Sequence, residues 1–309
     1  MNKIVFFNHY HRGDLHTSKE FVRQVIDNLP DVKFEYWSNN PNVLVSDLNL
    51  QITESPDSLD KSKALLKQGD TLYVNTWVGC QWDIFCKHGG INMNTFYEQW
   101  ELLFKGINKF FGSNLKLRSE KESYLPRMDW NKINPKIKDS IDVFMGNIKR
   151  KKVLICNNQP ASNQSFLYDI NNMLVKIAKE NSDVRFFTTD SIADKEDNPA
   201  NITSLEVVYD RLEDCDLREI SYMSSKCDVI IGKNSGPYVF SEIYDNYMDE
   251  SKTFVSFNTK NPEFDTIKET MSNGLNYKCN YVTVPIYTID KPEEKDVRAI
   301  DKAIRESIQ

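Results

Sequence analysis

The sequence is poor in histidine, and its cysteines have no regular spacing. Only four of its 309 residues are histidines. The six cysteines lie scattered along the chain, with no CxxC pair and no spacing typical of a disulfide framework, at positions Cys80, Cys86, Cys156, Cys215, Cys227 and Cys279. We therefore predict free thiols in a reducing compartment.

Long apolar runs and an excess of positive charge are also lacking. No stretch approaches the ~18 apolar residues that indicate a membrane-spanning helix, and the first apolar run is too short for a signal peptide. We expect a cytoplasmic protein, with peripheral membrane contact left open. A net charge of -6 and a pI near 5.4 argue against nucleic acid as a partner. The basic run Lys149–Lys152 is interpreted as a solvated hinge or domain edge.

Composition and length indicate an ordinary globular protein with two domains. Hydrophobic residues make up 40% of the chain and charged residues 27%. Apolar strands alternate with amphipathic helices in both halves, which predicts an α/β fold with parallel sheets. We expect an N-terminal, acceptor-side domain over 1–149 and a C-terminal, nucleotide-sugar-binding domain over 150–309. For the last helix, packing back on the first domain is left open as an alternative.

The expected elements follow from hydrophobic periodicity and turn residues. In the first half we expect strands at 4–7, 32–37 and 71–74, and helices opening at Thr17 with a capping box over Thr17–Glu20, at 61–67, from Phe96 and at 137–148. In the second half we expect strands at 153–156, 184–188, 205–208, 228–231, 253–257 and 281–284, and helices at 167–177, 217–223, from Pro237 through Tyr244, and 295–308. The aromatic stripe of the helix from Phe96 is interpreted as core.

The polar loop Asn8–His16 follows the first strand and holds three of the four histidines. Ligands of open α/β sheets bind outside the carboxyl ends of the strands, so these side chains are candidates for a site. Asp14 could act as a general base, or it could cap the helix near Thr17. His11, Arg12 and His16 could supply positive charge or orient an acceptor. Asn8 and the loop Asn75–Trp77 follow neighbouring strands and are expected on the acceptor side.

A glycine turn over Gly232–Pro237 forms the second candidate site. Gly232 and Gly236 would let the backbone approach a ligand, Ser235 could cap the following helix, and Pro237 suits its first turn. With Lys233 and Asn234, this turn could hold a phosphate; the alternative is a plain tight turn between strand and helix. Loops at Asn157–Ser165, Thr188–Asp190 and Asn258–Lys260 end other strands and are expected to meet the nucleotide, with Asn157 and Thr188 as the leading candidates.

These two stretches together resemble a known family. Gly13–Thr17 and Asp228–Pro237 look like the two signatures of the ADP-heptose lipopolysaccharide heptosyltransferases. The resemblance implies the GT-B fold, two Rossmann-like domains facing a cleft, and inverting, metal-independent glycosyl transfer. It implies a nucleotide-diphosphate sugar as co-substrate with no further cofactor, and a glycan or lipid-linked glycan as acceptor. It places the general base at Asp14 and the donor diphosphate at Ser235–Pro237.

The sequence also departs from that family at specific positions. Asn234 stands where the family has an aspartate, and Val239 stands near the place of its histidine. The lysine that the family carries after the first strand of the second lobe is missing from Asn157–Gln164. The resemblance therefore extends to the fold and the reaction class, while the sugar is left open.

Two other functions compete with glycosyl transfer. A catalytically silent GT-B-like protein that binds a nucleotide or glycan fits the replacements at Asn234 and Val239. A metal-dependent hydrolase could use His9, His11, Asp14 and His16, whose spacing is similar to that of HxHxDH hydrolases. His88 is the one other histidine in the chain. Because such hydrolases need more histidines than this sequence holds, we predict no metal site.

Overall fold

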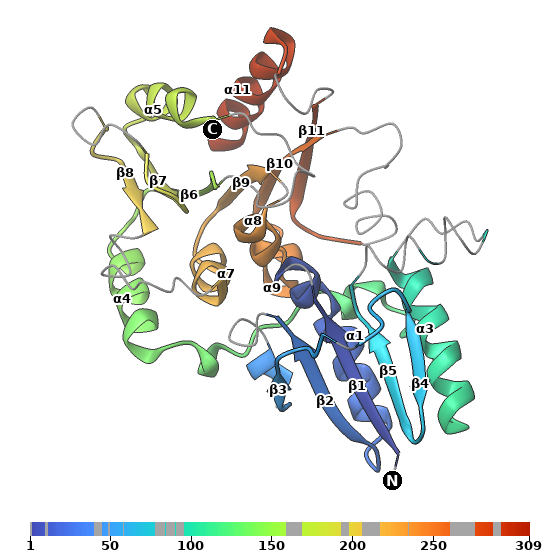
Figure 1. Ribbon diagram of the computed structural model, residues 1–309. Coiled ribbons are helices and arrows are strands. Elements are labelled where there is room, and N and C mark those ends of the chain that lie inside the picture. The colour runs from blue at the N-terminus through green and yellow to red at the C-terminus, as the bar shows by residue number, and fades with distance from the viewer. Residues whose placement is uncertain are drawn as a thin grey trace. The chain divides into compact units, whose positions relative to one another are not determined.

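The computed structural model describes residues 2–9, 12–39, 45–48, 50–57, 59–77, 84, 90, 96–158, 169–192, 198–205, 217–233, 235–259, 276–286 and 292–309 (Figure 1). The chain divides into two compact units, Met1–Arg127 with Ile267–Asn276 and Met128–Thr266 with Tyr277–Gln309. Each unit holds one sheet. Both are α/β units, as the alternation of strands and helices predicts.

The sheet of the first unit has the order β3-β2-β1-β5-β4. Its strands are β1 (Lys3–Asn8), β2 (Lys33–Ser38), β3 (Ile52–Thr53), β4 (Leu65–Gln68) and β5 (Thr71–Asn75). All neighbours pair parallel except β4, which runs antiparallel to β5 at the sheet edge. Every residue of β1 from Ile4 to Asn8 is buried, which is typical of a central parallel strand.

Two helices pack against each other in this unit, α1 (Arg12–Asn28) and α3 (Phe96–Phe111). The ring of Phe21 on α1 stacks on Trp100 and lies 5.0 Å, between ring centroids, from Phe104 of α3. Trp100, Leu103, Phe104 and Ile107 are at most 2% exposed, so the aromatic stripe is core, as predicted. Short 3₁₀ turns, η2 (Val45–Leu48) and η4 (Lys121–Tyr124), lie in the connections of this unit, and a third, η5 (Trp130–Lys132), belongs to the second unit.

Two expected helices of the first half differ in the structure. The helix expected at 61–67 is wrong, because Leu65–Gln68 pair with β5 as strand β4. The helix expected to open at Thr17 begins at Arg12, and Thr17–Glu20 are buried inside it, so they form no capping box at a helix start. Asp14 consequently lies in the first turn of α1 and not in a loop.

The sheet of the second unit has the order β11-β10-β9-β6-β7-β8, and all its pairs are parallel. The strands are β6 (Lys151–Cys156), β7 (Val184–Thr188), β8 (Ile202–Ser204), β9 (Val229–Lys233), β10 (Thr253–Thr259) and β11 (Asn280–Ile286). Taken in chain order, this is the 3-2-1-4-5-6 arrangement of a doubly wound Rossmann-like sheet.

The helices of this unit are α4 (Pro135–Gly146), α5 (Asn171–Glu180), α7 (Leu217–Ser225), α8 (Gly236–Ser241), α9 (Tyr244–Tyr247) and α11 (Glu294–Ile308). α4 belongs here because Asp142 accepts a 2.6 Å hydrogen bond from Tyr222 and pairs with Lys226 of the α7 region. The units therefore divide before α4, whereas the sheets divide between β5 and β6.

Two expectations for the second half are corrected, while α11 packs on β9, β10 and β11 of its own sheet. The single helix expected through Tyr244 is two short ones, since α8 ends at Ser241. The strand expected at 205–208 is β8, which ends at Ser204, and residues 206–208 lie outside the described part of the chain. Among the residues described, no helix is both long and apolar enough for a bilayer span.

Candidate functional site

The strand order of the second unit locates a ligand site. Between β6 and β9 the connections turn from one direction along the sheet to the other, and in doubly wound sheets ligands bind outside the carboxyl ends of the strands at this point. β6 ends at Cys156 and β9 at Lys233. The turn after β9, Asn157 and Thr188 all lie at this edge, which we call the donor edge.

Asn157 joins the strand ends of the donor edge. Its amide Nδ2 donates to Asn171 Oδ1 (3.0 Å) and to the Asp190 carbonyl (3.2 Å), and its Oδ1 accepts from the Asp190 N–H at 2.8 Å. These bonds connect the end of β6 with the start of α5 and the end of β7. Asn157 therefore fixes the loops of this edge.

The two glycines of the turn have different surroundings. A Cβ added at Gly232 would lie 2.8 Å from Cys156 Cβ and 2.7 Å from a ring carbon of Tyr238, so this glycine lets β6, β9 and α8 pack closely. Among the described atoms, a Cβ added at Gly236 would meet Leu217 alone, at 3.8 Å. Gly232 therefore serves packing, and the expectation that Gly236 lets a ligand approach the backbone stays a prediction.

The polar groups of the turn are one cation and one hydroxyl. Lys233 is only 5% exposed, and burial lowers its pKa to about 8, although the charge of Asp169 opposes this shift. Ser235 precedes α8, where Pro237 occupies the first turn as predicted. The Ser235 side chain makes no capping hydrogen bond, contrary to expectation, and its buried Oγ lacks a hydrogen-bond partner in the described part of the chain. Asn234 lies outside the described residues.

Thr188 adds a second hydroxyl at the donor edge. It is the last residue of β7, it is fully buried, and among described atoms nothing bonds to its Oγ1. Buried hydroxyl groups without partners are uncommon, because desolvating them costs about 1–3 kcal/mol. Of the other loops expected to meet the nucleotide, residues 159–168 and Lys260 lie outside the described part, as do the side chains of Asn258 and Thr259.

The first unit has its own point of reversal, between β1 and β5. We call the carboxyl ends of these strands the base edge. Asn75 Oδ1 accepts from the Trp77 N–H at 2.9 Å, and its Nδ2 donates to the Lys61 carbonyl at 3.3 Å, so this side chain shapes the loop. The rings of His9 and Trp77 meet edge to face with centroids 5.8 Å apart. Asn8 is buried, whereas His9 and Trp77 are partly exposed at this edge.

Asp14 is half-buried in the first turn of α1, directly after the base edge. Burial raises its pKa to about 7, while a hydrogen bond from its own backbone N–H opposes the rise. A carboxyl group with a pKa near neutrality is poised to exchange protons, as a general base must. The position inside the helix also makes the expected Asx-type cap near Thr17 wrong.

Beside Asp14 lies a buried hydroxyl cluster, of which the sequence analysis singled out Thr76 but neither Tyr36 nor Ser18. The Tyr36 hydroxyl bonds to Thr76 Oγ1, which in turn donates to the Phe7 carbonyl at 3.3 Å. Ser18 also reaches Tyr36, and burial raises the pKa of the tyrosine, with a smaller contribution from the charge of Asp14. A polar residue in mid-strand was the only signal for Tyr36. Ser18 shares a helix face with Asp14, four residues earlier.

His16 and Arg12, the other candidates of the first loop that the structure describes, have different surroundings from Asp14. His16 is fully buried, and burial lowers its pKa well below the usual value, with a smaller effect from Lys19. It is therefore neutral at pH 7 and supplies no positive charge. Two residues apart on a helix, Asp14 and His16 do not share a face. Arg12 is exposed at the start of α1, and His11 lies outside the described residues.

The metal site considered from the sequence would use His9, His11, Asp14 and His16. In the described part of the chain, which excludes His11, no group of three or more His, Cys, Asp or Glu side chains could hold a metal ion. His9 lies half-buried beside Trp77, whereas His16 is buried inside α1.

Solved structures share this arrangement of two sheets. The E. coli heptosyltransferase WaaC with ADP-2-deoxy-2-fluoro heptose superposes with a TM-score of 0.53 at 10% identity, over 98% of this chain and 99% of that one. A glycosyl transferase family 9 protein from Veillonella parvula gives a TM-score of 0.51 at 9% identity, over 99% and 96%. The chain has the GT-B fold. No protein-family model and no curated protein sequence matches it.

Proposed function

We propose that this protein is an inverting, metal-independent glycosyltransferase that moves a sugar from a nucleotide-diphosphate donor to a glycan acceptor. The observation that carries the proposal is that one point of strand reversal carries a candidate base and the other carries candidate phosphate-binding groups. The base edge carries Asp14, a carboxyl group with a pKa of about 7, and the donor edge carries Lys233 with two buried hydroxyls that lack partners in the described structure. The glycosyltransferases with the same fold support it.

Asp14 is the general base of the proposed reaction. Its carboxylate takes the proton of the acceptor hydroxyl as that oxygen attacks the anomeric carbon from the face opposite the leaving group. One C–O bond forms and the bond from the anomeric carbon to the phosphate oxygen breaks, so the configuration inverts. The electron pair leaves with the nucleoside diphosphate. His9 and Trp77 offer an aromatic surface for the acceptor sugar at the same edge.

The donor edge stabilises the leaving group. A protonated Lys233 and the hydroxyls of Ser235 and Thr188 supply positive charge and hydrogen-bond donors where negative charge develops on the diphosphate. The six-residue helix α8 adds little dipole of its own, so the side chains carry most of this effect. Gly236 leaves room for the phosphates to approach the backbone.

The deciding experiment combines nucleotide binding with turnover. A panel of nucleoside diphosphates is screened by thermal shift, with ADP first because ADP is bound in a WaaC structure of this fold. We expect stabilisation that EDTA does not change, followed by transfer from the matching nucleotide sugar with inverted anomeric configuration by NMR. Binding without any transfer or donor hydrolysis would instead indicate a silent binding protein. Loss of stability on adding EDTA would support the metal-dependent hydrolase.

A further inference from the structure

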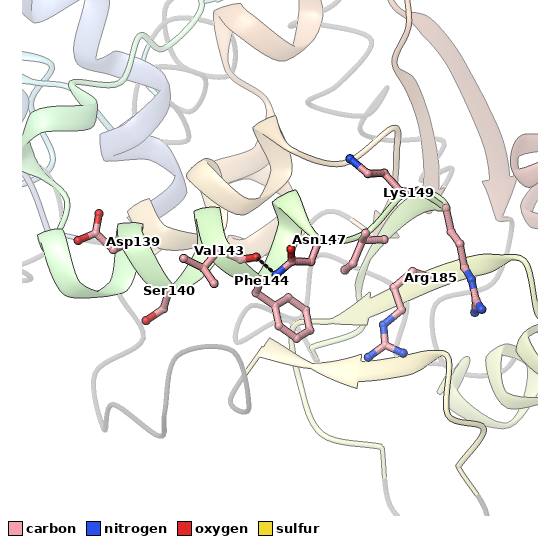
Figure 2. Close-up of a pocket in the computed structure, with 9 residues that line it drawn as sticks. Asp139, Ser140, Val143, Phe144, Asn147, Lys149 and Arg185 are labelled. Atoms are coloured by element: carbon pink, nitrogen blue, oxygen red, sulfur yellow. Dashed lines mark hydrogen bonds between the residues drawn. The ribbon is translucent and has the colours of Figure 1, made fainter.

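A second hollow lies at the opposite end of the Rossmann-like sheet in the second unit. It has a volume of about 880 Å³ and is lined by Asp139, Ser140, Val143, Phe144, Asn147, Ile148, Lys149, Arg150 and Arg185 (Figure 2). The residues come from the end of α4, the segment leading into β6, and the start of β7. We call it the basic groove.

The basic groove is separate from the donor edge. Arg150 directly precedes β6, and Arg185 is the second residue of β7, so both lie at the amino ends of strands whose carboxyl ends form the donor edge. At about 3.3 Å per residue, the six residues of β6 separate the two places by roughly 20 Å. The groove therefore takes no part in holding the nucleotide.

Two arginines are held close together at one end of the groove. Arg185 donates to the Ala200 carbonyl and to Thr203 Oγ1, and Arg150 donates to the Ser182 carbonyl at 2.8 Å. Burial lowers the pKa of Arg185, and the positive charge of Arg150 lowers it further. Neither makes an ion pair with any described carboxylate. The Nε of Arg185 is buried and has no hydrogen-bond partner among the described atoms.

Two fixed guanidinium groups without a counterion suit a phosphate. The planar guanidinium presents donors in a fork that matches phosphate oxygens, and neutral carbonyl partners hold the side chains without cancelling their charge. Lys149 adds a third cation from the same segment. The one carboxylate in the lining, Asp139, lies at the far end of the groove from Arg185 in Figure 2.

Three apolar side chains line the groove between the cations and the polar residues Asp139, Ser140 and Asn147. Val143 on α4 is 67% exposed, unusually high for a large hydrophobic side chain in this protein. Phe144 and Ile148 follow on the same stretch and line the hollow beside the arginines. Apolar side chains next to a cluster of cations are typical of surfaces that contact both the headgroups and the first carbons of a lipid layer.

We propose that the basic groove docks the protein on an anionic phospholipid bilayer. A lipid phosphate lies between Arg150 and Arg185, Lys149 faces neighbouring headgroups, and Val143, Phe144 and Ile148 contact the glycerol and upper acyl region. Charge complementarity carries this choice, because the protein as a whole is acidic, with a net charge of -6, while the groove is basic. The proposal is independent of the glycosyltransferase activity and stands or falls on membrane binding alone.

The test measures co-sedimentation of the full chain with vesicles. We expect binding to phosphatidylcholine vesicles that contain phosphatidylglycerol, little binding to phosphatidylcholine alone, and weakening with added salt. Arg150→Glu and Val143→Asp change exposed side chains, and each should lower the partition coefficient, by about tenfold or more for the charge reversal. Lys302→Glu on α11, exposed and equal in charge change, is the matched control and should bind like the wild type.

A competition arm distinguishes a bilayer from a soluble phosphate compound. Glycerol 1-phosphate carries the headgroup chemistry without acyl chains, and we expect it neither to bind tightly nor to displace the protein from vesicles. Efficient displacement would overturn membrane docking in favour of a soluble anion site. Equal binding to neutral vesicles, or unchanged binding of Arg150→Glu with an unchanged melting temperature, would also overturn it.

Discussion

The base edge and the donor edge both lie where the strand order reverses, but their buried polar side chains differ in hydrogen bonding. At the base edge, the side chains of Tyr36, Thr76 and Asn75 bond to one another or to the backbone. At the donor edge, Asn157 is bonded, but Ser235 Oγ and Thr188 Oγ1 are buried without partners among the described residues. In the proposed reaction, these two hydroxyls would bond to the donor.

At both edges, burial shifts the pKa of the ionisable side chain toward its neutral form. Burial raises the pKa of Asp14 to about 7 and lowers that of Lys233 to about 8, so in both cases the ionised form is disfavoured. A general base benefits, because a carboxylate with a pKa near 7 accepts a proton more strongly than an ordinary carboxylate and is still partly deprotonated at neutral pH. A phosphate ligand would restore the charge of the lysine, and this gain adds to its binding.

The largest effect should come from Asp14→Asn. It removes the base while keeping the shape of the side chain, so kcat should fall about 100- to 10,000-fold with nucleotide affinity unchanged. In the wild type, kcat/KM should rise as pH increases through about 7, since the base must be deprotonated; this limb should vanish in the variant. Pre-steady-state and steady-state kinetics over pH 5.5–9, an interval of about two units around neutrality, measure both.

The matched control for that prediction is Asp27→Asn, an exposed carboxylate near the end of the same helix. It should leave the rate and the pH profile unchanged. Asp14→Asn should also remain folded: the raised pKa means that the contribution of Asp14 to stability declines as pH rises from about 4 to about 7, and asparagine avoids this cost. Activity of Asp14→Asn within a few-fold of the wild type would remove the base assignment.

Alanine substitutions at the two glycines of the donor edge should distinguish an effect on packing from an effect on nucleotide binding. Gly232→Ala inserts a Cβ against Cys156 and Tyr238 and should destabilise the protein by about 1–3 kcal/mol in chemical denaturation. Gly236→Ala has room for its Cβ and should keep or slightly raise the melting temperature, yet weaken nucleotide binding several-fold. If Gly236→Ala binds nucleotide as the wild type does, the diphosphate does not lie against this turn.

Lys233→Gln should reduce nucleotide affinity by about 10- to 100-fold, the usual contribution of a charge-assisted hydrogen bond. For the wild type, affinity should fall as pH rises through about 8, where the free lysine loses its proton, and the variant should lack this dependence. Calorimetric titration with the nucleoside diphosphate gives both values. Lys179→Gln, on the exposed side of α5, is the control. An equal loss of nucleotide affinity in this variant would show that the overall charge of the protein matters, and not a contact with Lys233.

Much of the fold follows from the sequence, because central parallel strands are continuous apolar runs. Ile4–Phe7 and Val229–Ile231 were predicted on that basis and are fully or almost fully buried. β4 was missed because the segment around Leu65 has no apolar pattern that distinguishes strand from helix, and pairing with β5 decides it. The start of α1 was missed because a pattern typical of a cap, Thr17–Glu20, lies in the middle of a helix.

The candidate site was predictable by position but not by role. Sequence places polar residues after strands, so Asp14 and the turn over Gly232–Pro237 could be singled out. It could not distinguish Gly232 from Gly236, since the difference lies in contacts with Cys156, which is 76 residues from Gly232 in the sequence (232 − 156). Nor could it show that His16 is buried or that Ser235 makes no cap, because both depend on how helix and sheet pack.

The smallest effect, and the sharpest comparison, comes from Ser235→Ala. If Ser235 were an N-cap, removing its hydroxyl would cost about 1 kcal/mol of stability. The described structure gives that hydroxyl no bond to lose, so stability should be unchanged or slightly higher, while nucleotide affinity falls about 3- to 10-fold. Ser221→Ala should behave in the opposite way, because Ser221 Oγ is buried and donates to the Phe240 carbonyl at 2.6 Å. Chemical denaturation measures the stability of both variants, and calorimetry measures their nucleotide affinity. If Ser235→Ala lost stability and kept its affinity, the hydroxyl would serve the fold and not a ligand, and the proposed role of the donor edge would be wrong.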